Sequence, residues 1–112
     1  MAIQFAQMPT SMPPTTRLPG NIIVTIPIRN TGNSQSATIT ITLDPANNIM
    51  FESLTGRSRT YSRAVTVPNG EKTFQETLSL VQGNGGPVMA ARLDISIVGE
   101  NSSTALALGI IP

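Results

Sequence analysis

The sequence contains no cysteine and no histidine. Without cysteine, the chain has no disulfide, no thiol nucleophile and no cysteine-based zinc site. Without histidine, it lacks the commonest general base and the commonest metal ligand of proteins, and its serines lack their usual activating partner. We therefore expect a protein that is not an enzyme and that uses no metal and no cofactor.

Charged and aromatic residues are scarce. Charged residues form 12% of the chain, about half of the usual share, and the formal net charge is +1. This balance produces no electrostatic field strong enough to attract nucleic acid or anionic lipid. The three Phe and one Tyr are too few to form a stacking platform for bases. No run reaches the ~18 apolar residues of a membrane span, and residues 1–20 lack the features of a secretory signal. We expect neither nucleic acid nor a membrane as a partner.

The acidic residues are scattered along the chain, at Asp44, Glu52, Glu71, Glu76, Asp94 and Glu100. No two of them stand at the short spacing of a calcium-binding loop. Asp44 with Asn47 and Asn48 offers oxygens to a cation or, more simply, an Asx turn. We interpret residues 44–48 as a turn.

Apolar residues alternate with other residues from position 21 to position 43. The positions on the apolar side are Ile22, Val24, Ile26, Ile28, Ala37, Ile39, Ile41 and Leu43. A period of two in β-branched residues predicts two half-buried β-strands. Residues 30–35 between them are polar or turn-prone, and Gly32 adopts positive φ at little cost, so one turn joins the two strands.

The same alternation predicts further strands at residues 49–53, 65–67, 74–80, 89–98 and 104–111. Residues 68–71, with Asn69 before Gly70, form the strongest turn signal. No window shows the spacing of an amphipathic helix. We expect an all-β protein: an antiparallel β-sandwich of about seven strands, residues 21–112, preceded by an extended arm, residues 1–20.

Glu76 disagrees with the pattern of its own strand. It falls on the face that Phe74, Leu78 and Leu80 make apolar. A charged residue at such a position predicts either a β-bulge or a place at the edge of the sheet.

Residues 1–20 are rich in proline and methionine, with four of the nine prolines and three of the five methionines. Prolines remove backbone donors, so we expect an extended arm with at most a short strand at residues 3–7. One interpretation of the arm is a disordered leader or an ordinary edge strand. The other is a segment that docks on a neighbouring subunit, in which case its apolar side chains would fill pockets on that partner. These side chains are Phe5, Met8, Met12 and Leu18.

Two other surfaces are candidates for binding. Arg57, Arg59 and Arg63 lie close together beside Tyr61, and suit phosphate or an acidic protein surface. The alternative is a solvated strand or loop edge that its charges protect from aggregation. The last strand carries a small outward face of Ala105, Ala107 and Gly109, which would allow another sheet to approach closely or would simply pack inside the domain.

Four segments together resemble the immunoglobulin-like CARDB and related surface-protein modules. They are IIVTIPIRNTGN at residues 22–33, TITITL at 38–43, VTVPNGE at 65–71 before Phe74, and ARLDISI at 91–97. The resemblance implies an immunoglobulin-like sandwich in which the strand ending in Asn-Thr-Gly crosses to the opposite sheet. It also implies an adhesive or structural role, and it transfers no active-site residues.

A small sandwich with its own Met1, an extended arm and no signal is also similar to phage decoration proteins. We therefore expect a structural protein on a virion surface, a decoration or cement protein that attaches through its arm to the capsid or to neighbouring subunits of a homo-oligomer. The alternative is an extracellular, secreted cell-surface module for adhesion or for binding carbohydrate or protein.

Overall fold

The computed structural model describes residues 3–13, 15–43, 49–54, 56–82, 90–98 and 102–111. Throughout these ranges the chain forms β-strands, turns and bends with no helix, which confirms the all-β prediction. The predicted turn at 44–48 and the strand start at Met89 lie outside the described residues. None of the described elements is a helix long and apolar enough to cross a membrane.

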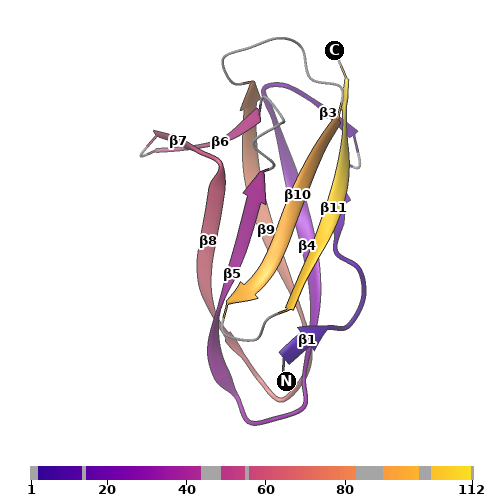
Figure 1. Cartoon of the computed structure of the whole chain (residues 1–112), viewed down its shortest axis with the longest axis vertical. Coiled ribbons are helices and arrows are strands. Elements are labelled where there is room, and N and C mark those ends of the chain that lie inside the picture. Colours follow the sequence, from indigo (N-terminus) through magenta and orange to yellow (C-terminus); the bar gives the residue numbers. More distant parts are fainter. Residues whose placement is uncertain are drawn as a thin grey trace.

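The described strands form two sheets that enclose one core (Figure 1). Across the first sheet the order is β1 (Ile3–Phe5), β4 (Gly20–Asn30), β9 (Gly70–Gln82), β6 (Ile49–Ser53) and β7 (Gly56–Ser58), and β2 (Thr10–Met12) also pairs with β4. Across the second sheet it is β3 (Thr15–Arg17), β11 (Ser102–Ile111), β10 (Ala90–Val98), β5 (Gln35–Leu43) and β8 (Thr60–Val67). The β3–β11 pair is parallel, and the other pairs are antiparallel.

The predicted strands within residues 21–43 are confirmed as β4 and β5. All eight side chains on their apolar side are buried. The two strands do not pair with each other: β4 pairs with β9 in the first sheet, and β5 pairs with β8 and β10 in the second. The turn between them therefore carries the chain from one sheet to the other.

Asn30 organises this crossing. Its buried amide donates to the backbone oxygens of Asn33 (2.9 Å) and Val67 (3.1 Å), and its Oδ1 accepts from the Gly32 amide (2.9 Å). Asn69 adds a bond from its Nδ2 to the Gly32 oxygen (2.8 Å). The β4–β5 crossing and the β8–β9 turn are thus held together by side-chain amides.

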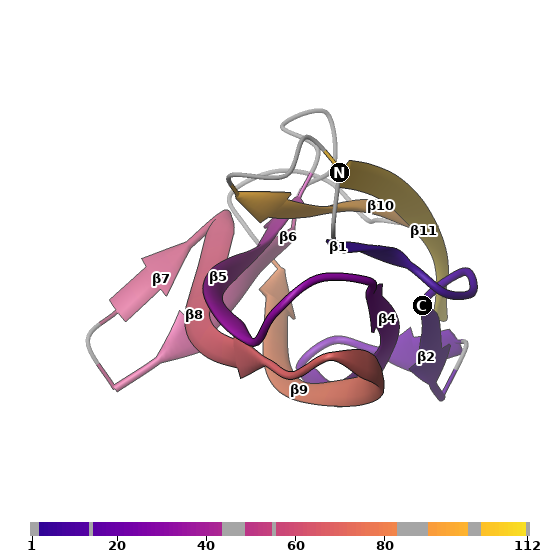
Figure 2. The same ribbon diagram turned by 90° about the horizontal axis from the view of Figure 1, so that it is seen from below.

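The amino-terminal segment contains three short strands, so the expectation of at most one, at residues 3–7, is wrong. β1 and β2 pair with β4, whereas β3 pairs with β11 in the other sheet. Figure 2 shows this segment running along the side where β4 and β11 lie. Because Ile3 is buried in the core, the segment completes the sandwich on this side.

Candidate functional site

The four apolar residues predicted to bind a partner divide into two pairs. Phe5 and Leu18 are partly buried and pack against the core of their own domain. Met8 and Met12 are exposed, with 65% and 71% of their surface accessible. Their segment is held by strand pairing on both sheets, so the two methionines are presented by an ordered part of the chain.

Met12 lies beside an exposed isoleucine. It is the register partner of Ile23 on β4, which is 40% accessible. Among the described residues the large exposed apolar side chains are these two, Met8, and Leu54 at the β6–β7 turn. Ile23 alternates with the apolar side of its strand and was not among the residues predicted to bind a partner; an isoleucine on the face that alternates with the apolar one was the available signal. We call Met12 and Ile23 the Met12 patch.

Met8 lies near the other sheet. The Thr104 hydroxyl at the beginning of β11 approaches the Met8 sulfur at 3.6 Å. Met8 therefore lies in the link between β1 and β2, which both pair with β4, and it reaches the beginning of β11 in the other sheet. Its exposed surface belongs to the side of the sandwich that this segment completes.

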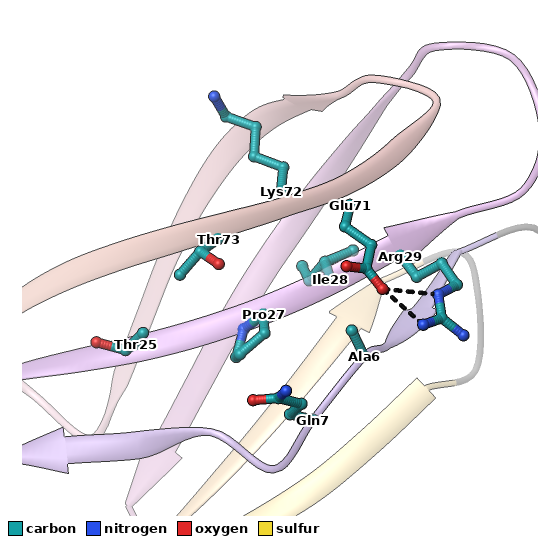
Figure 3. Close-up of a pocket in the computed structure, with 9 residues that line it drawn as sticks. All are labelled: Ala6, Gln7, Thr25, Pro27, Ile28, Arg29, Glu71, Lys72 and Thr73. Carbon is teal, nitrogen blue, oxygen red and sulfur yellow. Dashed lines mark hydrogen bonds and ion pairs between the residues drawn. The ribbon is translucent and has the colours of Figure 1, made fainter.

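A shallow groove of about 320 Å³ lies on the outer face of the first sheet (Figure 3). It is lined by Ala6, Gln7, Thr25, Pro27, Ile28, Arg29, Glu71, Lys72 and Thr73. β1 pairs with residues 28–30 of β4 and β2 pairs with residues 23–25, and the groove opens between these two regions. There the Ala6 amide donates to the Pro27 oxygen (2.9 Å). Pro27 has no amide of its own to offer the sheet.

An ion pair closes one end of this groove. Arg29 donates to Glu71 Oε1 from Nη2 (2.6 Å) and from Nε (3.1 Å), as the dashed lines in Figure 3 show. Both side chains are about half exposed, so water screens their charges and the pair contributes little to stability. The pair neutralises the charges at this end of the groove, whereas Lys72, which also lines the groove, places its Nζ 5.9 Å from the centre of the Phe74 ring.

The structure does not gather the three predicted arginines into one site. Arg57 on β7 pairs with Glu52 on β6, at 3.1 Å from Nε to Oε2. Arg63 on β8 pairs with Glu76 on β9. Arg59 lies between the two strands, and its backbone oxygen accepts from the Leu43 amide at 2.8 Å. Two of the guanidinium groups are thus committed to carboxylates within the domain.

Glu76 occupies an edge, and the alternative of a bulge is wrong. The β4–β9 register continues without interruption through the pair of Val24 and Glu76. On the other side of β9, pairing with β6 covers only residues 80–82, so in the described part of the chain β9 is unpaired there at Glu76. The Glu76 side chain is 1% accessible and receives the Arg63 Nε on both carboxylate oxygens.

The surroundings of this pair raise the pKa of two groups, Arg63 and Tyr61. The hydrogen bond to Glu76 raises the pKa of Arg63, which keeps the guanidinium charged. Burial, followed by the negative charge of Glu76, raises the pKa of Tyr61 above 10.0. Tyr61 is also held by Phe51, whose ring meets it edge to face at 6.5 Å and 67°.

The small outward face of β11 borders a charged pair. Ala105 is in register with Asp94, and Ala107 with Arg92. Arg92 Nε lies 3.0 Å from Asp94 Oδ1, and both side chains are about half exposed. Another sheet approaching the alanines would therefore have to accommodate these two charges.

No family model and no curated protein matches the chain. Among solved structures, the chain is similar to the alkylpurine DNA glycosylase AlkC of Pseudomonas fluorescens, solved bound to DNA that contains an abasic-site analogue, with a TM-score of 0.67 at 10% identity. The match covers 99% of this chain and 31% of the glycosylase chain. The similarity is therefore one of fold, to a part of a longer protein.

Proposed function

We propose that this chain is a non-enzymatic structural protein that assembles through its amino-terminal segment, as a decoration or cement protein on the surface of a virion. The observation that carries the proposal is the exposure of Met8 and Met12 on an ordered segment. Methionine is flexible and polarizable, and clusters of exposed apolar side chains mark protein contact surfaces. The partner is the shell or a neighbouring copy of the chain.

The strand order supports an immunoglobulin-like assignment within this proposal. The series β1-β4-β9-β6 corresponds to A-B-E-D, and β11-β10-β5 corresponds to G-F-C. β8 then takes the place beside strand C that variable-type domains give to C′. One departure remains: β6 precedes β8 in the chain, so the two elements between C and E occur in the reverse order.

The experiment is a comparison of molar mass by light scattering for the unchanged protein and for the double variant Met8→Ser/Met12→Ser. Deleting residues 1–20 would be a poor test because it removes the buried Ile3 and three strands. We expect the unchanged protein to form an oligomer and the variant to be a folded monomer. The matched control is Leu54→Ser, which removes an exposed apolar side chain at the β6–β7 turn.

An oligomer that survives in the double variant would contradict the proposed role of the methionines. A monomer at every concentration for the unchanged protein would contradict self-assembly through this segment. Circular dichroism of each variant separates a loss of contact from a loss of folding.

One observation favours a second candidate, an adhesive module within a longer surface protein. β1 begins at one end of the long axis and β11 finishes at the other, in a domain 46 Å long (Figure 1). Domains with their first and last strands so placed join end to end in a chain. Monomers in the experiment above would support this candidate.

A further inference from the structure

A second cleft lies on the side of the sandwich where β6 separates from β9. The two strands pair only from Ile49–Gln82 to Phe51–Leu80, after which β6 turns into β7. A cleft of about 270 Å³ opens in the gap, walled by residues 51–53, 58, 60–62 and 77–79. β8 supplies its third wall, so the cleft is bounded by strands of both sheets.

The walls of the cleft are rich in hydroxyl groups. Six of the ten described residues that line it are serine or threonine. Some of these hydroxyls are occupied: the Ser79 Oγ donates to Asn21 Oδ1 at 2.9 Å, and Ser62 Oγ lies 3.3 Å from Thr40 Oγ1. The hydroxyls of Thr60 and Thr77 have no side-chain hydrogen bond to any other described residue. They are therefore available to donate to and accept from a ligand.

The remaining lining is apolar and aromatic. Phe51 and Leu78 are buried beneath the cleft, and the partly exposed ring of Tyr61 lies among its walls. Phe51 fixes the orientation of the Tyr61 ring by its edge-to-face contact at 6.5 Å. Because burial raises the pKa of Tyr61 further above neutral pH, its hydroxyl is protonated there and able to donate. The cleft thus combines a rigid aromatic surface with hydroxyl groups.

The described residues of the lining carry no unpaired charge. Its one carboxylate, Glu52, is bound by Arg57 Nε at 3.1 Å. A ligand with a net charge would gain no complementary partner here. A ligand with apolar C–H faces and many hydroxyls matches both the aromatic surface and the exposed threonine hydroxyls, because ligand hydroxyls that lose water on binding need hydrogen-bond partners in the cleft.

We propose that this cleft binds a short neutral saccharide. Thr60 and Thr77 hydrogen-bond the sugar hydroxyls, Tyr61 contacts an apolar face of a sugar ring, and Glu52 accepts from a hydroxyl while Arg57 holds it in place. This site does not include Met8 or Met12, so it stands or falls independently of the assembly role.

The test uses the intrinsic fluorescence of Tyr61, the only tyrosine of a chain that has no tryptophan. The probes are maltose, cellobiose and diacetylchitobiose, with a sulfated disaccharide as the charged comparison. We expect a saturable change in Tyr61 emission with at least one neutral probe, together with amide shifts of residues 58, 60 and 77 in nuclear magnetic resonance spectra.

Two isosteric variants locate the site. Thr60→Val and Thr77→Val keep the shape and strand propensity of the side chain but remove the hydroxyl, and each should weaken binding about tenfold. Thr66→Val, on the exposed face of β8 away from the cleft, should leave binding unchanged. Three results would overturn the proposal: no saturable change with any neutral probe, preference for the sulfated probe, or affinity that neither variant lowers.

Discussion

Arg63 and Glu76 face each other across the open side of the sandwich, each on a strand edge that no other described strand pairs with at that point. Arg63 is on β8, the last strand of the second sheet, and Glu76 is on the stretch of β9 that β6 does not reach. Inward-pointing charges are one way in which sheets protect exposed strand edges from pairing with other chains. This pair therefore closes the core on one side, as the amino-terminal segment does on the other.

Replacing Arg63 with methionine should destabilise the protein. Glu76 would remain buried without its cation, which costs ~3–5 kcal/mol in a fully buried pair. Arg63 is 45% accessible, so water would replace part of its effect, and we expect a loss of about 2 kcal/mol in the free energy of unfolding. Urea denaturation followed by circular dichroism measures this loss.

The matched control is Arg57→Met, because both members of its pair with Glu52 are about half exposed. That variant should lose no more than ~1 kcal/mol. The double variant Arg63→Met/Glu76→Leu should recover most of the stability but aggregate faster, since its edge strands have lost their charges. Equal losses for the two single arginine variants would show that Glu76 does not depend on Arg63.

Tyr61 should make stability depend on pH in the alkaline range. Burial raises its pKa in the folded protein above the 10.0 of an unperturbed tyrosine. As pH rises, the unfolded chain therefore loses the proton first, so the stability linked to Tyr61 is complete below pH 10.0 and is lost above it. Tyrosinate absorbance of the native protein should show a midpoint above that of the urea-unfolded chain. Coincident midpoints would refute this prediction, and Tyr61→Phe should remove the tyrosine contribution.

Asn30→Ala should disrupt the junction between the two sheets. The variant loses three hydrogen bonds and leaves the Val67 and Asn33 oxygens without their amide donor, so we expect a loss of about 2–3 kcal/mol in the free energy of unfolding. Asn30→Asp is the informative companion, because a carboxylate keeps the shape but repels both oxygens. Asn33→Ala, which removes an exposed side chain, serves as the control. Asn30→Ala unfolding at the same urea concentration as that control would contradict the role given to Asn30.

Gly20→Ala should loosen the amino-terminal segment. A Cβ at this position would meet the backbone oxygen of Arg17 and, at 2.6 Å, the Thr16 hydroxyl, so the turn between β3 and β4 would have to shift. We expect a loss of about 1–3 kcal/mol. Hydrogen exchange should report faster exchange at residues 15–17 with little change in the middle of β5. Unchanged exchange in β3 would show that the turn absorbs the methyl group.

Local patterning was enough to predict most of the long strands. Burial on one face of a sheet imposes a period of two, and the apolar sides of β4 and β5 follow it without exception. The same rule marked Glu76 as a residue needing an explanation. Patterning did not predict the role of Phe5 and Leu18. The sequence shows that they are apolar, but whether they cover their own core or contact another protein depends on the path of residues 1–20.

The sequence by itself determined the class of fold, the main strands and the scarcity of groups for catalysis. These properties depend on composition and on the spacing of neighbours along the chain. Only the tertiary structure decided that β4 and β5 belong to different sheets, that Arg63 forms an ion pair with Glu76, and that Met12 lies beside Ile23 on the surface. Each of these relationships joins residues brought together by strand order and register, which the alternation within one strand does not specify.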